Sequence, residues 1–253
     1  MIFDSHAHYD DEAFNEEREA ILNSLPKNGI SPIVNVSAQL SGVTATVELT
    51  EKYPFIYGSV GVHPDHVGEL SEEKIQWMKE LAGREKIVAV GEIGLDHYWD
   101  TESDEVQRKW FIRQLELAGE VKKPVIIHSR EAAADTMYIM KNYAQGLDGV
   151  IHCYSYSREM AEEYVKMGFY IGIGGVVTFK NAKKLKDVAA AIPIEKIVLE
   201  TDCPYMAPEP YRGKRNQSSY IQYVAEKIAE LKEMSPEEVI AVTEKNARDL
   251  YGI

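Results

Sequence analysis

Short apolar segments alternate with amphipathic segments along the whole chain of 253 residues, and this alternation restricts the fold more than any other feature. Most of the apolar segments are continuously apolar, as strands buried on both faces of a parallel sheet should be. The eight segments are Met1–Phe3, Pro32–Val36, Ile56–Val62, Ile87–Val90, Pro124–Ile127, Gly149–Ile151, Phe169–Ile173 and Lys196–Leu199. The repeat predicts an α/β protein, a (β/α)8 TIM barrel in which residues 1–253 form a single domain.

Charged and apolar residues with helical spacing separate the apolar segments. The clearest examples are Asp11–Leu25, Ser71–Leu81, Asp104–Val121, Arg158–Met167 and Lys180–Ile192. Ser235-Pro236-Glu237-Glu238 predicts a capped helix that runs to about Leu250. The polar segment from Pro204 to about Ser219 predicts a long loop after the eighth strand, where barrel loops shape the substrate site.

Composition and charge exclude several classes of protein. A formal net charge of −13 argues against broad, non-specific affinity for nucleic acid, but it allows a nucleic-acid substrate that is held locally. No stretch approaches the roughly 20 apolar residues that span a bilayer, and the first residues do not resemble a signal peptide. Two cysteines, Cys153 and Cys203, do not indicate a disulfide framework. We therefore expect a cytoplasmic protein, and the sequence indicates no obligate protein partner.

Six side chains of the kinds that bind metals stand at or just beyond the ends of apolar segments. They are His6, His8, Glu92, His128, His152 and Asp202. In a parallel barrel the C-terminal ends of the strands carry the active site. Five of the seven histidines in the chain fall at or just past the predicted ends of strands one, three, five and six. The joint pattern predicts one or two divalent cations and an activated water.

Each of these residues alone also fits a simpler role. His6 and His8 would point to the same face of a strand, yet two polar residues at a strand exit give the same spacing. Glu92 could form a structural salt bridge, or it could bridge two cations. His128 and His152 could each be a hydrogen-bonded histidine of the core.

Catalytic and substrate-binding roles can be assigned to a few further side chains. Asp202 can ligate a metal and accept a proton from the attacking water, so Asp202 and Glu92 are the candidate catalytic residues. Glu200 and Asp96 are expected to orient the ligands rather than bind the metal. The candidate substrate-binding residues are His63, Arg130, Lys214 and Arg215, of which the cationic three could clamp a phosphate. The basic group could equally be a solvated loop.

At these residues the sequence resembles the TatD-like family of metal-dependent hydrolases and DNases, within the amidohydrolase-type barrels. The matching motifs are Asp4-Ser5-His6-Ala7-His8, Gly61-Val62-His63-Pro64, Gly91-Glu92-Ile93-Gly94-Leu95-Asp96, Pro124-Val125-Ile126-Ile127-His128-Ser129-Arg130, His152-Cys153-Tyr154-Ser155, Glu200-Thr201-Asp202-Cys203-Pro204-Tyr205 and Arg212-Gly213-Lys214-Arg215-Asn216. The motifs run in order over almost the whole chain. The resemblance implies a (β/α)8 barrel, metal-ligand roles for the six residues above, and hydrolysis, with several relatives acting as 3′→5′ exonucleases on DNA.

Two positions depart from the pattern of that family. Tyr156 stands where a glycine commonly follows the His-Cys-aromatic-Ser motif, and Gln217-Ser218 replaces a common Glu-Pro. Both departures lie toward the predicted substrate side, so they bear on the identity of the substrate more than on metal binding.

The leading hypothesis is a metal-dependent phosphodiesterase that acts on DNA or another phosphodiester through two divalent cations of zinc, manganese or magnesium. The alternative is an amidohydrolase-type enzyme acting on a small ester, lactone, amide or acyl substrate, because both chemistries need the same Lewis acid and hydroxide. A non-catalytic, metal-stabilised scaffold is the third hypothesis, and it would require a closed coordination sphere without bound water.

Overall fold

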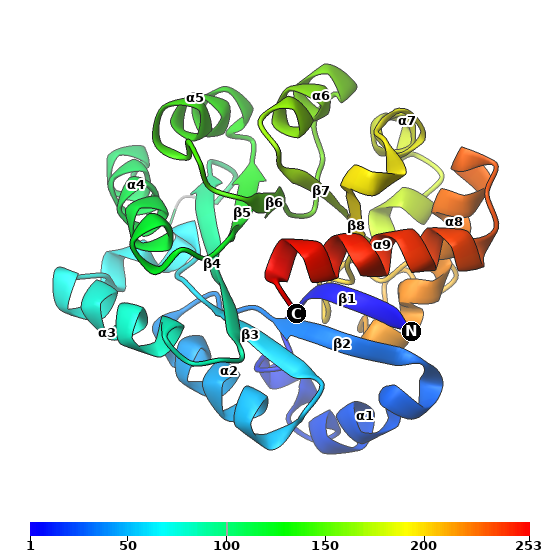
Figure 1. Cartoon of the computed structure of the whole chain (residues 1–253), viewed down its shortest axis with the longest axis horizontal. Coiled ribbons are helices and arrows are strands. Elements are labelled where there is room, and N and C mark those ends of the chain that lie inside the picture. Colours follow the sequence, from blue (N-terminus) through cyan, green and yellow to red (C-terminus); the bar gives the residue numbers. More distant parts are fainter. Residues whose placement is uncertain (100) are drawn as a thin grey trace. The chain divides into compact units, whose positions relative to one another are not determined.

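The protein, as a computed structural model that describes residues 1–99 and 101–253, has eight strands in one parallel sheet with the order β1 to β8 (Figure 1). The strands are β1 (Ile2–Ala7), β2 (Ile30–Asn35), β3 (Ile56–Val60), β4 (Ile87–Asp96), β5 (Val125–Arg130), β6 (Gly149–Ile151), β7 (Tyr170–Ile173) and β8 (Ile197–Leu199). Each overlaps one of the predicted apolar segments. The (β/α)8 fold class predicted from the alternation is therefore confirmed.

Helices occupy the segments between the strands. The α-helices are α1 (Arg18–Ser24), α2 (Leu40–Lys52), α3 (Glu72–Ala82), α4 (Asp104–Val121), α5 (Ala133–Tyr143), α6 (Arg158–Lys166), α7 (Lys183–Ala191), α8 (Ile221–Lys232) and α9 (Pro236–Tyr251). Short 3-10 helices are η1 (Glu12–Phe14), η2 (Pro26–Asn28), η3 (Pro64–Glu69), η4 (Gly175–Thr178), η5 (Ile194–Lys196) and η6 (Ser218–Tyr220). The capping box of Ser235 and Glu238 opens α9 as the sequence predicts. Among the described helices, none is long and apolar enough to cross a membrane.

The described residues fall into two compact units. The first unit comprises residues 1–35 and 153–253, and the second comprises residues 36–152. In the first unit β1 pairs with β2, β7 pairs with β8, and Ala7 at the end of β1 forms a bridge with Cys203 beyond β8. In the second unit β3, β4, β5 and β6 pair in succession. We call these the discontinuous unit and the continuous unit.

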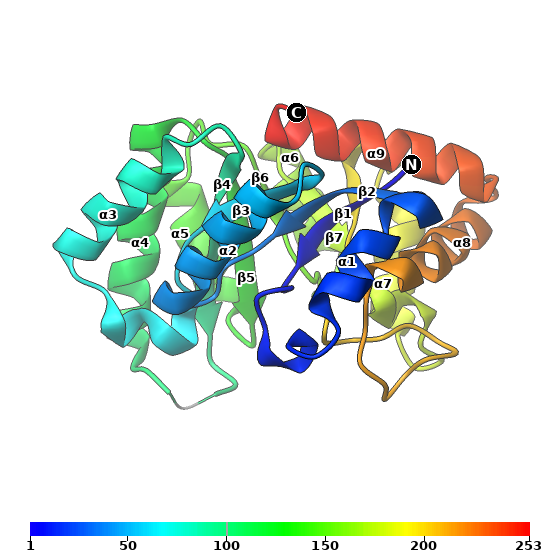
Figure 2. The same cartoon turned by 90° about the horizontal axis from the view of Figure 1, so that it is seen from below.

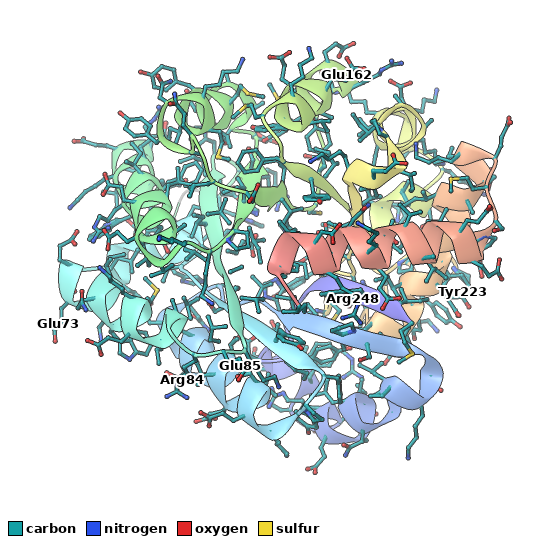
Figure 3. The ribbon with its side chains drawn as sticks, viewed as in Figure 1. Glu73, Arg84, Glu85, Glu162, Tyr223 and Arg248 are labelled. Carbon is teal, nitrogen blue, oxygen red and sulfur yellow. The ribbon has the colours of Figure 1, made fainter. Side chains whose placement is uncertain are left out.

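The core of the continuous unit lies between its strands and its helices α2 to α5, which Figure 1 shows outside β3 to β6. All ten residues of β4 are buried. Charged residues of this unit, such as Glu73 and Arg84, are exposed and point away from the strands (Figure 3). Because β4 is buried over its whole length, a carboxylate within it is costly unless hydrogen bonds or a cation compensate for the lost water.

Three strands and one helix differ from the bounds predicted from the sequence. Strands β1, β4 and β5 continue past their apolar residues, so His6, Glu92 and His128 lie within strands rather than after them. The predicted helix over residues 11–25 is interrupted: Asp11 caps η1, and the Arg18 side chain donates hydrogen bonds to the carbonyls of residues 9, 10 and 11. Those backbone acceptors are satisfied without a continuous helix.

Candidate metal centre

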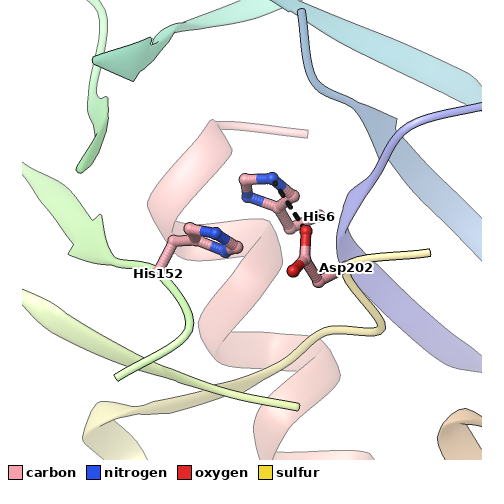
Figure 4. A group of neighbouring side chains, drawn as sticks. All are labelled: His6, His152 and Asp202. Carbon is pink, nitrogen blue, oxygen red and sulfur yellow. Dashed lines mark ion pairs between the residues drawn. The ribbon is translucent and has the colours of Figure 1, made fainter. Parts of the chain in front are cut away.

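His6, His8 and Asp202 form a group of three potential ligands in the discontinuous unit. Their contacting atoms are close: His6 Nε2 lies 3.0 Å from His8 Nε2, and Asp202 Oδ1 lies 3.3 Å from His8 Nε2 and 3.9 Å from His6 Nε2. Figure 4 shows Asp202 pointing toward the ring of His6, with a dashed line marking this pair. Since residues two apart in a strand share a face, β1 presents both imidazoles on one side.

Backbone hydrogen bonds fix this first group. Asp202 N donates to His6 O at 2.9 Å, and His8 N donates to Cys203 O at 2.8 Å. Asp202 has a φ of 55°, which places it in the left-handed region that costs a residue with a side chain free energy. Aspartate tolerates that region better than most residues. The surrounding bonds therefore hold Asp202 in a conformation that turns its carboxylate toward the two imidazoles.

The buried carboxylate of Asp4 holds the residues around the first group in place through hydrogen bonds. Its oxygens accept hydrogen bonds from Thr201 N at 2.9 Å, Thr201 Oγ1 at 2.6 Å and Ser218 Oγ at 2.5 Å. Burial raises the pKa of Asp4 to about 6 in spite of these bonds, which favour the charged form. Asp4 thus ties β1 to the residue before Asp202 and to the end of the long loop. Asp4 was not among the site residues predicted from the sequence.

Glu92, His128 and His152 form a second group of three potential ligands in the continuous unit. Glu92 Oε1 lies 2.8 Å from His128 Nδ1 and 3.3 Å from His152 Nε2. Glu92 belongs to β4, His128 to the neighbouring β5, and His152 follows β6 directly. In the pairing of β4 with β5, Gly94 lies opposite His128, so His128 is on the strand adjacent to Glu92 and two positions further along it.

Asp96 anchors His128 on the side away from Glu92. Asp96 Oδ2 lies 2.9 Å from His128 Nε2, so the imidazole is held between two carboxylates. Burial alone would lower the pKa of His128, but the hydrogen bonds with Asp96 and Glu92 outweigh it and raise that pKa to about 8. Burial would likewise raise the pKa of Asp96, but the bonds with His128, Tyr98 N and Trp99 N lower it to about 2. Asp96 has the geometry of a carboxylate that orients a ligating histidine.

His63 lies beside the second group. Its Nε2 is 3.9 Å from Glu92 Oε1, and its ring packs edge-on against His128 with 4.2 Å between centroids. Burial, together with the charge of His128, lowers the pKa of His63 to about 3, so its imidazole is neutral at pH 7. Asp65 N donates to Nδ1 at 3.2 Å, which leaves that nitrogen as an acceptor. His63, Glu92 and His128 can also be grouped as potential ligands.

The long loop after β8 supplies two of the three cations predicted to bind substrate, Lys214 and Arg215, and these two have different surroundings. Figure 2 shows this loop on the same side of the discontinuous unit as η1. Arg215 is engaged in the protein, because it donates to Ala13 O at 2.7 Å and to Glu17 Oε2 at 2.5 Å. Lys214 is exposed, and its ammonium group makes no ion pair within residues 1–99 and 101–253. A cavity of about 830 Å³ lies between residues 11–17 and the loop, with Lys214, Arg215 and Tyr205 in its lining.

Three further residues shape the surroundings of the two groups. Asn216 is buried and donates to Thr201 O at 2.8 Å and Tyr205 O at 2.7 Å, which folds the long loop back on itself. Glu200 Oε1 accepts a hydrogen bond of 2.6 Å from Cys153 N. Arg130 does not stand alone as a cation: its guanidinium carbon lies 3.8 Å from the centre of the Tyr98 ring. Neither Asn216 nor Tyr98 was a candidate from the sequence, where an asparagine after a basic run and a tyrosine in a polar loop are unremarkable.

Both groups suit a divalent cation by their chemistry. Each offers imidazole nitrogens and a carboxylate oxygen, the donors that zinc and other transition ions accept and that manganese also tolerates. In the first group three such atoms face one another across 3.0–3.9 Å. The Nε2 atoms of His6 and His8 are too close for both to carry a hydrogen that points at the other. At least one of them therefore has a lone pair that a cation can use.

The (β/α)8 barrel and these two groups of potential ligands are those of a metal-dependent hydrolase. The model of the TatD related DNase family matches residues 3–252, so the chain belongs to that family. This agrees with the resemblance seen in the sequence motifs.

Similar proteins span the whole chain. YabD of Bacillus subtilis (strain 168), named an uncharacterized metal-dependent hydrolase, is 44% identical over all of both chains. YcfH of Escherichia coli (strain K12), which has the same description, is 35% identical over 100% of this chain and 96% of its own. The crystal structure of YjjV, a TatD homologue from Escherichia coli K12, matches with a TM-score of 0.93 and 30% identity, covering 100% of this chain and 98% of YjjV.

Proposed function

We propose that this chain is a two-metal phosphodiesterase that hydrolyses DNA, of the 3′→5′ exonuclease type. One observation carries the proposal: two groups, each with three potential ligands, lie in or just beyond the C-terminal halves of strands in a chain that belongs to the TatD related DNase family. Paired cations are the usual catalysts of phosphodiester hydrolysis, because they stabilise both the attacking and the leaving oxygen.

The ligand roles follow from the two groups. His6, His8 and Asp202 would hold one cation, and His128 and His152 would hold the second. Glu92 would be shared between the two, so the proposal requires the two groups to form a single site. When bound, the cations would lower the pKa of a water molecule and neutralise the phosphate oxygens.

Side chains of the protein would carry the proton and orient the ligands. The Asp202 carboxylate would accept the proton of the attacking water, a role that needs an ionised oxygen next to the reacting atoms. Asp96 would hold His128 in one orientation through its 2.9 Å contact. Lys214 would contact a phosphate of the substrate as a point charge, since Arg215 is already paired with Glu17.

The proposal can be tested by the choice of substrate. The metal-free protein would be reconstituted with zinc, manganese or magnesium and assayed on single-stranded DNA labelled at its 5′ end, on a generic phosphodiester, and on a panel of esters and lactones. We expect stepwise shortening of the DNA from its 3′ end, and we expect a chelator to abolish it. Turnover of esters or lactones without DNA cleavage would overturn the proposal and establish the carbonyl-hydrolase alternative.

Replacing Lys214 and Arg215 one at a time should separate substrate binding from loop anchoring. Lys214→Ala should raise KM for DNA and reduce the slope of log K against log salt by about one, with a smaller effect on kcat. Arg215→Ala should lower the free energy of unfolding by up to about 1 kcal/mol, because its ion pair with Glu17 is partly exposed. Steady-state kinetics across a salt series and denaturant unfolding measure the two effects. An unchanged KM and salt slope in Lys214→Ala would mean that this loop is only a solvated surface.

A further inference from the structure

Two exposed aromatic side chains stand next to the second group of potential ligands. Tyr98 and Trp99 lie two and three residues after Asp96, the last residue of β4, and they are 49% and 52% exposed. Their rings meet edge to face, with 4.8 Å between centroids. Large aromatic side chains lose favourable burial when they stay in water, so an adjacent exposed pair indicates a surface that a ligand covers.

A cation completes this cluster. The Arg130 guanidinium carbon lies 3.8 Å from the centre of the Tyr98 ring and 5.6 Å from that of Trp99. Arg130 forms no ion pair among residues 1–99 and 101–253, and the contact that its guanidinium makes there is with the two aromatic rings. An exposed aromatic surface beside a guanidinium suits a ligand that has both a planar ring and an anionic group.

Hydrogen bonds hold the cluster at a fixed place relative to His128. Asp96 Oδ1 accepts bonds from Tyr98 N at 2.8 Å and Trp99 N at 3.2 Å, while Asp96 Oδ2 contacts His128 Nε2 at 2.9 Å. Gln107 of α4 bonds both Asp96 N and Asp96 O at 2.9 Å. One carboxylate therefore connects the aromatic pair to a candidate metal ligand, which gives the cluster a preorganised position.

The charge of the protein limits how it can bind a polyanion. With 28 basic and 41 acidic residues it lacks the broad basic surface on which phosphate contacts usually depend. Stacking of bases on aromatic rings does not need such a surface, because every base has a flat face whatever its sequence. In an acidic nuclease, stacking would have to supply a larger share of the affinity.

We propose that Tyr98, Trp99 and Arg130 form a stacking site for a nucleobase of a single-stranded nucleic-acid substrate. The inference rests on the proposed phosphodiesterase function. It adds to that function a preference for unpaired bases, because a base must leave its own stack before it can stack on an aromatic side chain of the protein. Trp99 supplies the larger ring, and the two residues are about equally exposed, at 49% for Tyr98 and 52% for Trp99. Arg130, stacked on Tyr98, places positive charge where the adjoining phosphate would lie.

The test compares Trp99→Ala with Trp99→Phe and with a distant control, Tyr138→Ala. Tyr138 is 59% exposed on α5 of the same unit and belongs to neither group of ligands. For short single-stranded DNA, Trp99→Ala should raise KM and the Kd measured by fluorescence anisotropy about five- to a hundredfold, with a smaller change in kcat. Trp99→Phe should restore most of the binding, and Tyr138→Ala should bind like the parent protein.

A second measurement separates a stacking role from a structural one. The same proteins would be assayed on an oligonucleotide that carries abasic sites in place of its terminal nucleotides, on which Trp99→Ala should lose far less relative to the parent. Equal KM values for Trp99→Ala and the parent on intact DNA would overturn the stacking site while DNA cleavage itself stands. No DNA cleavage by the metal-loaded parent would instead overturn the proposed function and the stacking site together.

Discussion

The Asp202→Asn substitution is expected to remove nearly all hydrolysis while the protein keeps its fold. An asparagine side chain would retain the shape of the aspartate, but its amide is a weaker ligand and cannot accept the proton of the attacking water. Loss of a positioned general base typically costs about 10²–10⁴ in rate, and weaker metal binding would add to that. The measurement is single-turnover cleavage of DNA at saturating metal, with metal content determined on the same sample.

Asp249→Asn is the matched control for this substitution. It also removes one carboxylate from the discontinuous unit, but Asp249 lies on α9 and pairs with Lys245 on the surface. We expect normal turnover from that variant. A folded, metal-loaded Asp202→Asn protein that cleaves DNA at the parental rate would refute the catalytic role of Asp202.

Gly94→Ala is expected to damage both the fold and the second group of ligands. A Cβ atom at this position would lie 1.9 Å from His128 O, and the φ of Gly94 is 153°, a conformation that residues with side chains rarely adopt. The neighbour is backbone in the paired strand β5, so it cannot move without shifting His128 relative to Glu92. We expect a loss of about 4 kcal/mol or more in the free energy of unfolding, measured by denaturant titration, and reduced metal content in any protein that folds.

Gly146→Ala controls for the backbone conformation alone. Gly146 also has a positive φ, 78°, but a Cβ there would meet no atom within 4 Å. The cost should be only about 1–2 kcal/mol, the usual penalty for a left-handed residue, and metal binding should be unaffected. If the two substitutions were equally harmful, the close approach of β4 to β5 at Gly94 would not explain the effect.

Much of the fold could be predicted from the sequence because strands buried on both faces are apolar throughout. All eight strands were found in this way, and α4 has the predicted bounds Asp104–Val121. The ends of strands were harder to predict. Local hydrophobicity cannot show that β4 continues through Glu92 to Asp96, since the polar residues there are accommodated by partners on other strands.

The candidate site could be predicted in its residue types but not in its supporting contacts. The six predicted ligands lie in two groups of three in the structure, and their union in one site stays a prediction. Asp4, whose partners Thr201 and Ser218 are about two hundred positions away, gives no local signal of its role. Lys214 and Arg215 are adjacent in sequence and look equivalent there. Of the two, only Arg215 has an acidic partner among the described residues, and that partner, Glu17, is about two hundred positions away, so local sequence gives no sign of the pair.

The division of the chain into a continuous and a discontinuous unit has a consequence for its biosynthesis. Residues 36–152 are contiguous, so the continuous unit is complete once residue 152 has been synthesised, whereas the discontinuous unit also needs residues 153–253. At a synthesis rate of about 5–20 residues per second, the synthesis of those residues takes roughly 5–20 s. During this time β1, with His6 and His8, has no β8 to complete its edge. We expect the nascent N-terminal strands to be the part of the chain most dependent on chaperones and most exposed to premature capture of metal ions.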